Sequence, residues 1–176
     1  MVGERVARYT SLYDISRRNI AEIIHIIDTD GAYIRDDNII EDASALSPIY
    51  SENNIRTSDF LSLSKRNEQK RSCLDKLIST RQIWNIPYHV YYMSCNLDHV
   101  LFGYINLDRT EKIKRALRFA RKYSTNLTLF LDFLNSNLLC VSDDYYSTWN
   151  YIKKDNHSLE RHSNINICFT AGNREK

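Results

Sequence analysis

The sequence has little glycine and little proline, with four Gly and two Pro in 176 residues. β-Sandwiches and loop-rich scaffolds need turn residues in quantity, so this scarcity argues against both. No apolar run approaches the roughly 20 residues that a membrane helix needs. The first residues also lack the apolar stretch of a secretory signal. We therefore expect a cytoplasmic globular protein without a membrane segment.

Several chemical signatures are missing as well. Lys and Arg total 24 against 22 Asp and Glu, a net charge of +2, so bulk charge demands neither a nucleic acid nor a membrane as partner. The sequence contains no G-x-x-x-x-G-K-[ST] and no G-x-G-x-x-G, which argues against a P-loop NTPase and a standard dinucleotide site. The four cysteines form no C-x-x-C pair, so we expect reduced, buried thiols and no zinc site.

Two apolar, β-branched or aromatic segments are typical of buried strands. AEIIHIIDTDG covers residues 21–31, and IPYHVYYMS covers residues 86–94. Apolar residues at helical spacing predict helices over 58–80 and 110–123. Because a crossover of this length favours a right-handed β-α-β unit, we expect 21–28 and 86–94 to be adjacent parallel strands.

This alternation of strands and helices predicts the fold class. We expect a single α/β domain over residues 1–176, a Rossmann-like three-layer domain with a mostly parallel central sheet. The polar, acidic segment 35–57 is expected to be a loop or insertion. Residues 145–154 are expected to form a short helix and 165–169 a last short strand.

The strongest chemical signal follows the first strand, where Asp28 and Asp30 stand one residue apart before Gly31. Ligands of open parallel sheets bind beyond the carboxyl ends of the strands. Alternation along an extended chain puts both carboxylates on one side, where they could share a hard cation such as Mg²⁺ or Mn²⁺. The competing interpretation is structural: Asp28 caps a helix and Asp30 begins a turn.

A second polar segment leaves the second strand and contains Asp98 and His99. If the strands are neighbours, both residues face the edge that carries the two aspartates, where His99 could act as an acid, a base or a ligand. The alternative is a helix that begins at Ser94 or Asn96.

Asp143 and Asp144 follow a third apolar run. They could form a third acidic pair at the same edge. The first turn of a helix, where acidic side chains are favoured, is the stronger interpretation.

The helix expected over 110–123 is strongly basic. One set of its residues is expected to face the core: Ile113, Ala116, Leu117 and Ala120. Another set forms a stripe that could contact nucleic-acid phosphates: Lys112, Arg115, Arg118 and Lys122. A solvated, salt-bridged surface has the same pattern.

An apolar strand ending in Asp-x-Asp, followed by a long helix, a strand and SCNLDHVLFGYINL, resembles the TOPRIM-like nucleases of the RloB-like and OLD-like defence systems. The resemblance covers about residues 18–123 and implies a magnesium-dependent nuclease or nucleic-acid-processing domain. The family pattern also has an earlier strand that ends in a catalytic glutamate, whereas this chain offers only Glu4 and Glu22 upstream. Either the first strand is missing, or Asp98 replaces that carboxylate, or the domain is a non-catalytic relative.

The Asp-x-Asp-Gly motif also resembles that of the haloacid dehalogenase-like phosphatases, which implies Asp28 as nucleophile and Asp30 as acid/base. Ser94, a lysine within 112–122 and the pair Asp143/Asp144 would then resemble the later motifs of that family. A third hypothesis is a non-catalytic inhibitor or partner-binding protein, for which twelve Tyr and two Trp supply interface residue types. Both enzyme hypotheses require a metal ion, and the third does not.

Overall fold

The structure is a computed structural model that describes residues 2–170. Its elements, in chain order, are α1 (Val2–Leu12), the 3₁₀ turn η1 (Arg17–Asn19), β1 (Ile23–Asp28), the 3₁₀ turn η2 (Asp36–Asn38), β2 (Ile39–Glu41), β3 (Ile49–Tyr50), β4 (Ile55–Thr57), α2 (Phe60–Ser79), β5 (Gln82–Ile83), β6 (Ile86–Met93), α3 (Leu97–Phe102), α4 (Arg109–Tyr123), α5 (Leu127–Leu134), α6 (Tyr145–Ile152) and α7 (Asn166–Thr170).

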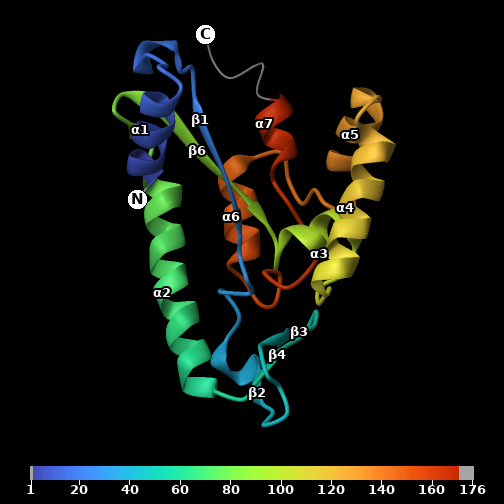
Figure 1. The fold of residues 1–176 in the computed structure, drawn as a ribbon. Coiled ribbons are helices and arrows are strands. Elements are labelled where there is room, and N and C mark those ends of the chain that lie inside the picture. Colours follow the sequence, from blue (N-terminus) through green and yellow to red (C-terminus); the bar gives the residue numbers. More distant parts are fainter. Residues whose placement is uncertain (1, 171–176) are drawn as a thin grey trace.

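The two long strands pair with each other as the sequence predicts. β1 and β6 are parallel and in register from Ile23 opposite Tyr88 to Asp28 opposite Met93. β5 joins the outer side of β6 as a short antiparallel strand, so the sheet order is β1-β6-β5. Figure 1 shows β1 and β6 side by side through the middle of the molecule, with α2 along one side and α4 and α5 on the other. Both long strands therefore end at the same edge.

Segment 35–57, expected as a loop or insertion, carries a second small sheet. Its order is β2-β4-β3, with β2 parallel and β3 antiparallel to β4. This sheet lies below the carboxyl ends of β1 and β6 in Figure 1.

The predicted three-layer domain with a mostly parallel central sheet is wrong. The residues that the structure describes form two mixed sheets of three strands each. The apolar runs near the carboxyl end do not extend the main sheet, because residues 127–134 form α5 and residues 166–170 form α7. The predicted strand over 165–169 is therefore also wrong. Without a third long strand, the sheet remains two long strands and one short one.

Both faces of β6 are covered, as the alternation of side chains along a strand requires. Tyr88, Val90 and Tyr92 point to one face and pack with buried side chains of α2 and α6. Tyr91 and Met93 point to the other face, where they pack with residues of α3, α5 and the segment before α7. This double burial fixes the end of β6, and with it the position of the residues that follow.

The predicted long helices are confirmed. α2 begins after Asp59, whose side chain accepts a hydrogen bond from the Ser62 amide at 2.9 Å. α4 begins after Asp108, which accepts from Thr110 and Glu111. The helix predicted over 145–154 is α6.

The face of α4 that packs inward differs from the predicted one. The residues expected in the core are exposed: Ile113, Ala116, Leu117 and Ala120. The partly buried row lies beside them on the helix: Glu111, Arg115, Phe119 and Tyr123. Both rows have helical spacing, so apolar periodicity alone could not choose between them. The row that contains Phe119 and Tyr123 packs inward because aromatic rings bury more apolar area than the alanines of the other row.

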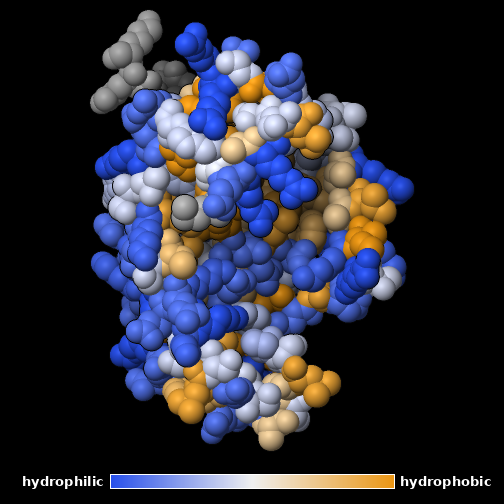
Figure 2. Space-filling model, turned by 60° about the vertical axis from the view of Figure 1, so that its left-hand side comes forward, coloured by the Kyte–Doolittle hydropathy of each residue, from blue (hydrophilic) through white to orange (hydrophobic). Residues whose placement is uncertain are grey.

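Of the four cysteines, Cys95 is buried as expected, whereas Cys73 is exposed. Within residues 2–170, none of the helices has the length and hydrophobicity of a membrane-spanning segment. Some large apolar side chains reach the surface, such as Ile24 and Ile26 of β1, about half exposed at 47% and 50%. Figure 2 shows hydrophobic residues in and around a hollow on one face of a mainly hydrophilic surface.

Candidate functional site

The carboxyl ends of β1 and β6 are held together by a buried hydrogen-bond network around Thr29. The Thr29 hydroxyl donates to the Ser158 carbonyl at 3.0 Å and accepts from the Cys95 amide at 2.8 Å. The Asp30 amide donates to the Cys95 carbonyl at 2.7 Å. Hydrogen bonds therefore join three segments that are far apart in the chain, around Thr29, Cys95 and Ser158. These bonds hold the backbone in place at this edge.

The backbone at this edge takes uncommon conformations. Asp30 and Cys95 have positive φ angles of 49° and 56°, and Gly31 has a φ of 61°. Non-glycine residues occupy this left-handed region rarely, and they cluster where function constrains the chain. Gly31 can adopt this conformation because glycine has no Cβ atom, and it allows the chain to turn sharply after β1. A Cβ atom there would lie 2.5 Å from a Leu159 methyl group, so the position also requires close packing.

Asp30 and Asp98 both lie close enough to Asp28 for their charges to act on it. The pKa of Asp28 is raised, first by burial and then by the charges of Asp30 and, more weakly, Asp98. A hydrogen bond from the Leu97 amide and the charge of Lys70 act in the opposite direction. The edge predicted from the two strands therefore brings three of the candidate carboxylates together.

Two of these carboxylates have lysine partners. Lys70 of α2 forms a salt bridge with Asp30, and Lys112 of α4 forms one with Asp98 at 2.8 Å. Arg66 of α2 donates to the Asp30 carbonyl at 2.9 Å. Cations from helices on both sides of the strands thus converge on the acidic edge.

The donor set matches the chemistry of the predicted cation, because carboxylate oxygens are the ligands that Mg²⁺ and Mn²⁺ prefer. Residues 2–170 contain no group of three or more His, Cys, Asp or Glu side chains already arranged to hold a metal ion. The ammonium group of Lys70 occupies the coordination space of Asp30. A divalent cation could use Asp28 and Asp30 if this lysine moved aside.

His99 lies on α3 but in the interior. Its side chain is 3% exposed, and its Nδ1 atom is buried without a hydrogen-bond partner among the described residues. Burial, together with the nearby Arg161 and His162, lowers its pKa to about 4. His99 is therefore neutral at pH 7. The groups that shift it belong to the carboxyl-terminal segment and do not include the acidic edge.

The segment that follows β6 also begins a helix, as the alternative interpretation predicts. Asn96 caps α3 by accepting a hydrogen bond from the His99 amide at 2.9 Å. Asp98 in the first turn still contributes its carboxylate to the edge, so capping and clustering coexist.

The residues that resemble later phosphatase motifs are engaged elsewhere. Ser94 is buried and its hydroxyl donates to the His157 carbonyl at 2.9 Å. Asp144 caps α6 by accepting from the Ser147 amide at 2.6 Å. The helix-start interpretation of Asp143 and Asp144 is therefore the one that the structure supports.

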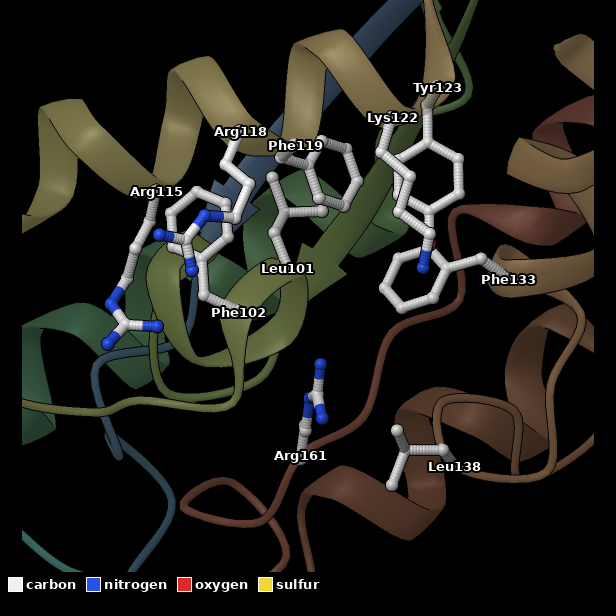
Figure 3. A pocket seen from close by; sticks show the side chains of 10 residues that line it. All are labelled: Leu101, Phe102, Arg115, Arg118, Phe119, Lys122, Tyr123, Phe133, Leu138 and Arg161. Atoms are coloured by element: carbon white, nitrogen blue, oxygen red, sulfur yellow. The ribbon is translucent and has the colours of Figure 1, made fainter.

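The predicted basic stripe divides into two parts. Lys112 pairs with Asp98 at the acidic edge. Arg115, Arg118 and Lys122 line a pocket under α4, together with Arg161. Figure 3 shows the three α4 side chains reaching down into this pocket and Arg161 pointing up toward them from the carboxyl-terminal segment.

Sequence reasoning missed Lys70 and Arg66 as residues of the site. The available signal was the polar run KRNEQKR in the middle of an otherwise amphipathic helix. This run is polar because its cations bind the segment that follows β1, including the Ala32 carbonyl, which accepts from Arg71 at 2.9 Å. Arg161 carried no signal, because only tertiary structure brings it to the pocket.

The fold and site have no counterpart in the comparisons with known proteins, since no protein-family model, curated protein or solved structure matches this chain.

Proposed function

We propose that this protein is a metal-dependent enzyme that acts on phosphodiesters, with a TOPRIM-like arrangement of carboxylates and with nucleic acid as its substrate. Asp28 and Asp30 bind Mg²⁺ or Mn²⁺, and Asp98 supplies a further carboxylate in place of the upstream glutamate of the resembling family. The observation that carries the proposal is the gathering of Asp28, Asp30 and Asp98 at the shared end of two parallel strands, where the charges of Asp30 and Asp98 act on Asp28. A cation there would offset the burial, and then the neighbouring negative charges, that raise the pKa of Asp28.

The lysines have a role in the same proposal. If a cation were held by Asp30, Lys70 would lose this salt-bridge partner and would be available to contact a phosphate oxygen of the substrate. Lys112, on the opposite side of the edge, can do the same when it leaves Asp98. A bound Mg²⁺ would polarise the phosphoryl oxygen as a Lewis acid. The residues of this chain would orient the phosphate between the ammonium groups of Lys70 and Lys112.

The proposal places the protein in the cytoplasm, a compartment in which disulfides are rare and a buried cysteine such as Cys95 stays a thiol. In this proposal the protein acts in a defence system, as the TOPRIM-like nucleases that it resembles do.

Calorimetric titration with Mg²⁺ and with Mn²⁺ tests the metal site. The wild type should bind, Asp28→Asn should bind at least tenfold more weakly, and Asp132→Asn should bind like the wild type. Asp132 is a matched control because it is an exposed aspartate on α5, away from the acidic edge. Equal titration of Asp28→Asn and Asp132→Asn would contradict the assignment of the site.

Cleavage assays test the reaction. Supercoiled DNA, single-stranded RNA and a generic phosphomonoester are each incubated with Mg²⁺, Mn²⁺ or EDTA. Metal-dependent cleavage of either nucleic acid supports the proposal. Turnover of the monoester alone would favour the haloacid dehalogenase-like phosphatase instead.

A second candidate is a protein that binds a partner without catalysis. One observation favours it: Asp30 and Asp98 both already have lysine partners, so the edge is satisfied without a metal. Absence of a heat signal with both cations and of cleavage of all substrates would favour this candidate.

A further inference from the structure

A pocket of about 380 Å³ lies between α3, α4, α5 and the carboxyl-terminal segment. Its size falls in the range of small-molecule sites. Its lining combines basic side chains with aromatic and aliphatic ones, and it includes no Asp or Glu. The basic residues of the lining are Arg115, Arg118, Lys122 and Arg161.

The cations of this pocket are short of anionic partners. Within residues 2–170, the salt bridges of α4 are made by Lys112, Lys114 and Arg115, which leaves Arg118 and Lys122 without a carboxylate. Arg161 donates two hydrogen bonds to the Val100 carbonyl, a neutral acceptor, at 3.1 and 3.0 Å. Figure 3 shows that Arg161 approaches from the side opposite α4, so positive charge enters the pocket from two directions. Like charges that converge in this way favour an anion between them.

The walls of the pocket are aromatic. Phe119 is central, with its ring centroid 5.8 Å from that of Phe102, 4.5 Å from that of Tyr123 and 5.6 Å from that of Phe133. Phe102 and Tyr123 come from different helices, α3 and α4, and Phe133 comes from α5. Such rings offer flat faces and edges to a planar ligand. A site with aromatic walls and several cations therefore suits a ligand that is aromatic at one end and anionic at the other.

We propose that this pocket binds one nucleotide unit, with the base against Phe119 and its neighbouring rings and the phosphate among Arg118, Lys122 and Arg161. Aromatic stacking combined with a positively charged groove is the means by which proteins hold single-stranded nucleic acids without reading their sequence. A base that is paired and stacked in a duplex cannot enter a pocket of this kind unless it first leaves the stack. The ligand is therefore an unpaired nucleotide, either free or within a single strand.

This inference rests on the proposed function for its biological setting and deepens it by naming single strands as the substrate class. The pocket itself contains none of the carboxylates of the acidic edge. Binding is therefore measured in EDTA, where a failure of the pocket is distinct from a failure of the metal-dependent reaction.

Fluorescence anisotropy at low salt measures the binding of four probes to the full chain. Three of the four are labelled: a twelve-nucleotide oligothymidylate, an abasic strand of the same length and a duplex of the same length. The fourth, thymidine monophosphate, is unlabelled and is measured by its competition with the labelled oligothymidylate. The oligothymidylate should bind at least fivefold more tightly than the abasic strand and the duplex. Competition by the mononucleotide identifies a free nucleotide as a sufficient ligand, and competition by oligomers alone identifies the single strand. Both of these results support the pocket.

Variants locate the binding. Arg118→Gln should weaken oligothymidylate binding about tenfold and lower the slope of log affinity against log salt by about 0.7. Arg121→Gln is the matched control, since Arg121 is an exposed arginine of the same helix that does not line the pocket. It should change affinity less than threefold.

The aromatic wall is tested by Phe119→Leu, which should bring oligothymidylate binding down to that of the abasic strand and leave abasic binding unchanged. Phe119→Tyr keeps the ring and should restore at least half of the preference for bases, which separates loss of stacking from loss of folding. Equal effects of the two arginine substitutions would overturn the proposal, as would equal affinity for the oligothymidylate and the abasic strand. Absence of oligothymidylate binding by the wild type at low salt would also overturn it.

Discussion

His99 makes the stability of this protein sensitive to acid. Its side chain is 3% exposed, and burial together with Arg161 and His162 lowers its pKa from 6.5 to about 4. Between these values the unfolded chain binds a proton at this position and the folded chain does not. The unfolded state therefore binds more protons, and the free energy of unfolding falls as the pH falls from about 6.5 to about 4.

The size of this effect follows from the same two pKa values. Each unit of pKa is equivalent to about 1.36 kcal/mol, so the full contribution is about 3 kcal/mol. Titration of a single site with these values predicts a loss of about 2 kcal/mol between pH 7 and pH 5. Below about pH 4 both states carry the proton, and His99 contributes no further loss.

The substitution His99→Phe removes this titration while keeping a ring of similar size in the interior. Urea denaturation at half-unit steps from pH 7.5 to pH 4 gives the free energy of unfolding of each protein. The difference between His99→Phe and the wild type should shift in favour of the variant by about 2 kcal/mol as the pH falls from 7 to 5. The absolute offset at pH 7 does not enter the comparison.

Val100→Ala is the matched control for this experiment. Val100 is a fully buried neighbour on the same helix that has no titratable group. Its truncation should cost about 1–3 kcal/mol, by the same amount at every pH. The reasoning about the buried imidazole is refuted if the difference in free energy of unfolding between His99→Phe and the wild type does not change with pH, as is expected for Val100→Ala.

Three further substitutions test the edge that carries the proposed site. Gly31→Ala should destabilise the fold by about 2 kcal/mol or more in thermal or urea denaturation, because φ is 61° and the new Cβ would lie 2.5 Å from Leu159; a loss below about 0.5 kcal/mol would show that the edge relaxes easily. Thr29→Val should lower the free energy of unfolding by about 1–3 kcal/mol, since the buried hydroxyl that donates to Ser158 is lost. Thr29→Ser keeps the hydroxyl and should retain most of the wild-type stability. Equal stability of the two variants would contradict the role of the network. Lys70→Met should strengthen Mg²⁺ binding about tenfold in calorimetry by removing the competing ammonium group, whereas unchanged or weaker binding would count against competition between lysine and metal.

Local pattern in the sequence was sufficient for the elements with strong periodicity. The β-branched run before Asp28 and the aromatic run before Ser94 predicted two parallel neighbours, and β1 and β6 pair in that way. The long helices α2 and α4 were predicted because the helical spacing of apolar residues is a local property of the sequence. The meeting of Asp28 and Asp98 followed from these two strands, since parallel neighbours end at one edge.

Tertiary structure alone decided how large the sheet is and which face of α4 packs inward. Residues 166–170 have a composition that suits a strand or a helix, and their packing against α5 beside β6 makes them helical. On α4, two rows of residues have equal helical spacing, and the body of the protein buries the row that contains Phe119. Short-range pattern cannot resolve such alternatives because both satisfy it equally well.

The charge partners of the site were also decided by tertiary structure. By sequence, Lys70 and Arg161 are ordinary surface cations. In the fold, Lys70 of α2 pairs with Asp30, which follows β1, and Arg161 completes the pocket under α4. The sequence determined the acidic strand end and the basic helix, because each is a contiguous pattern within the reach of local chemistry. Which cation neutralises a carboxylate, and which stays free for a ligand, depends on distances between segments 40 or more residues apart, and only the folded chain sets those distances.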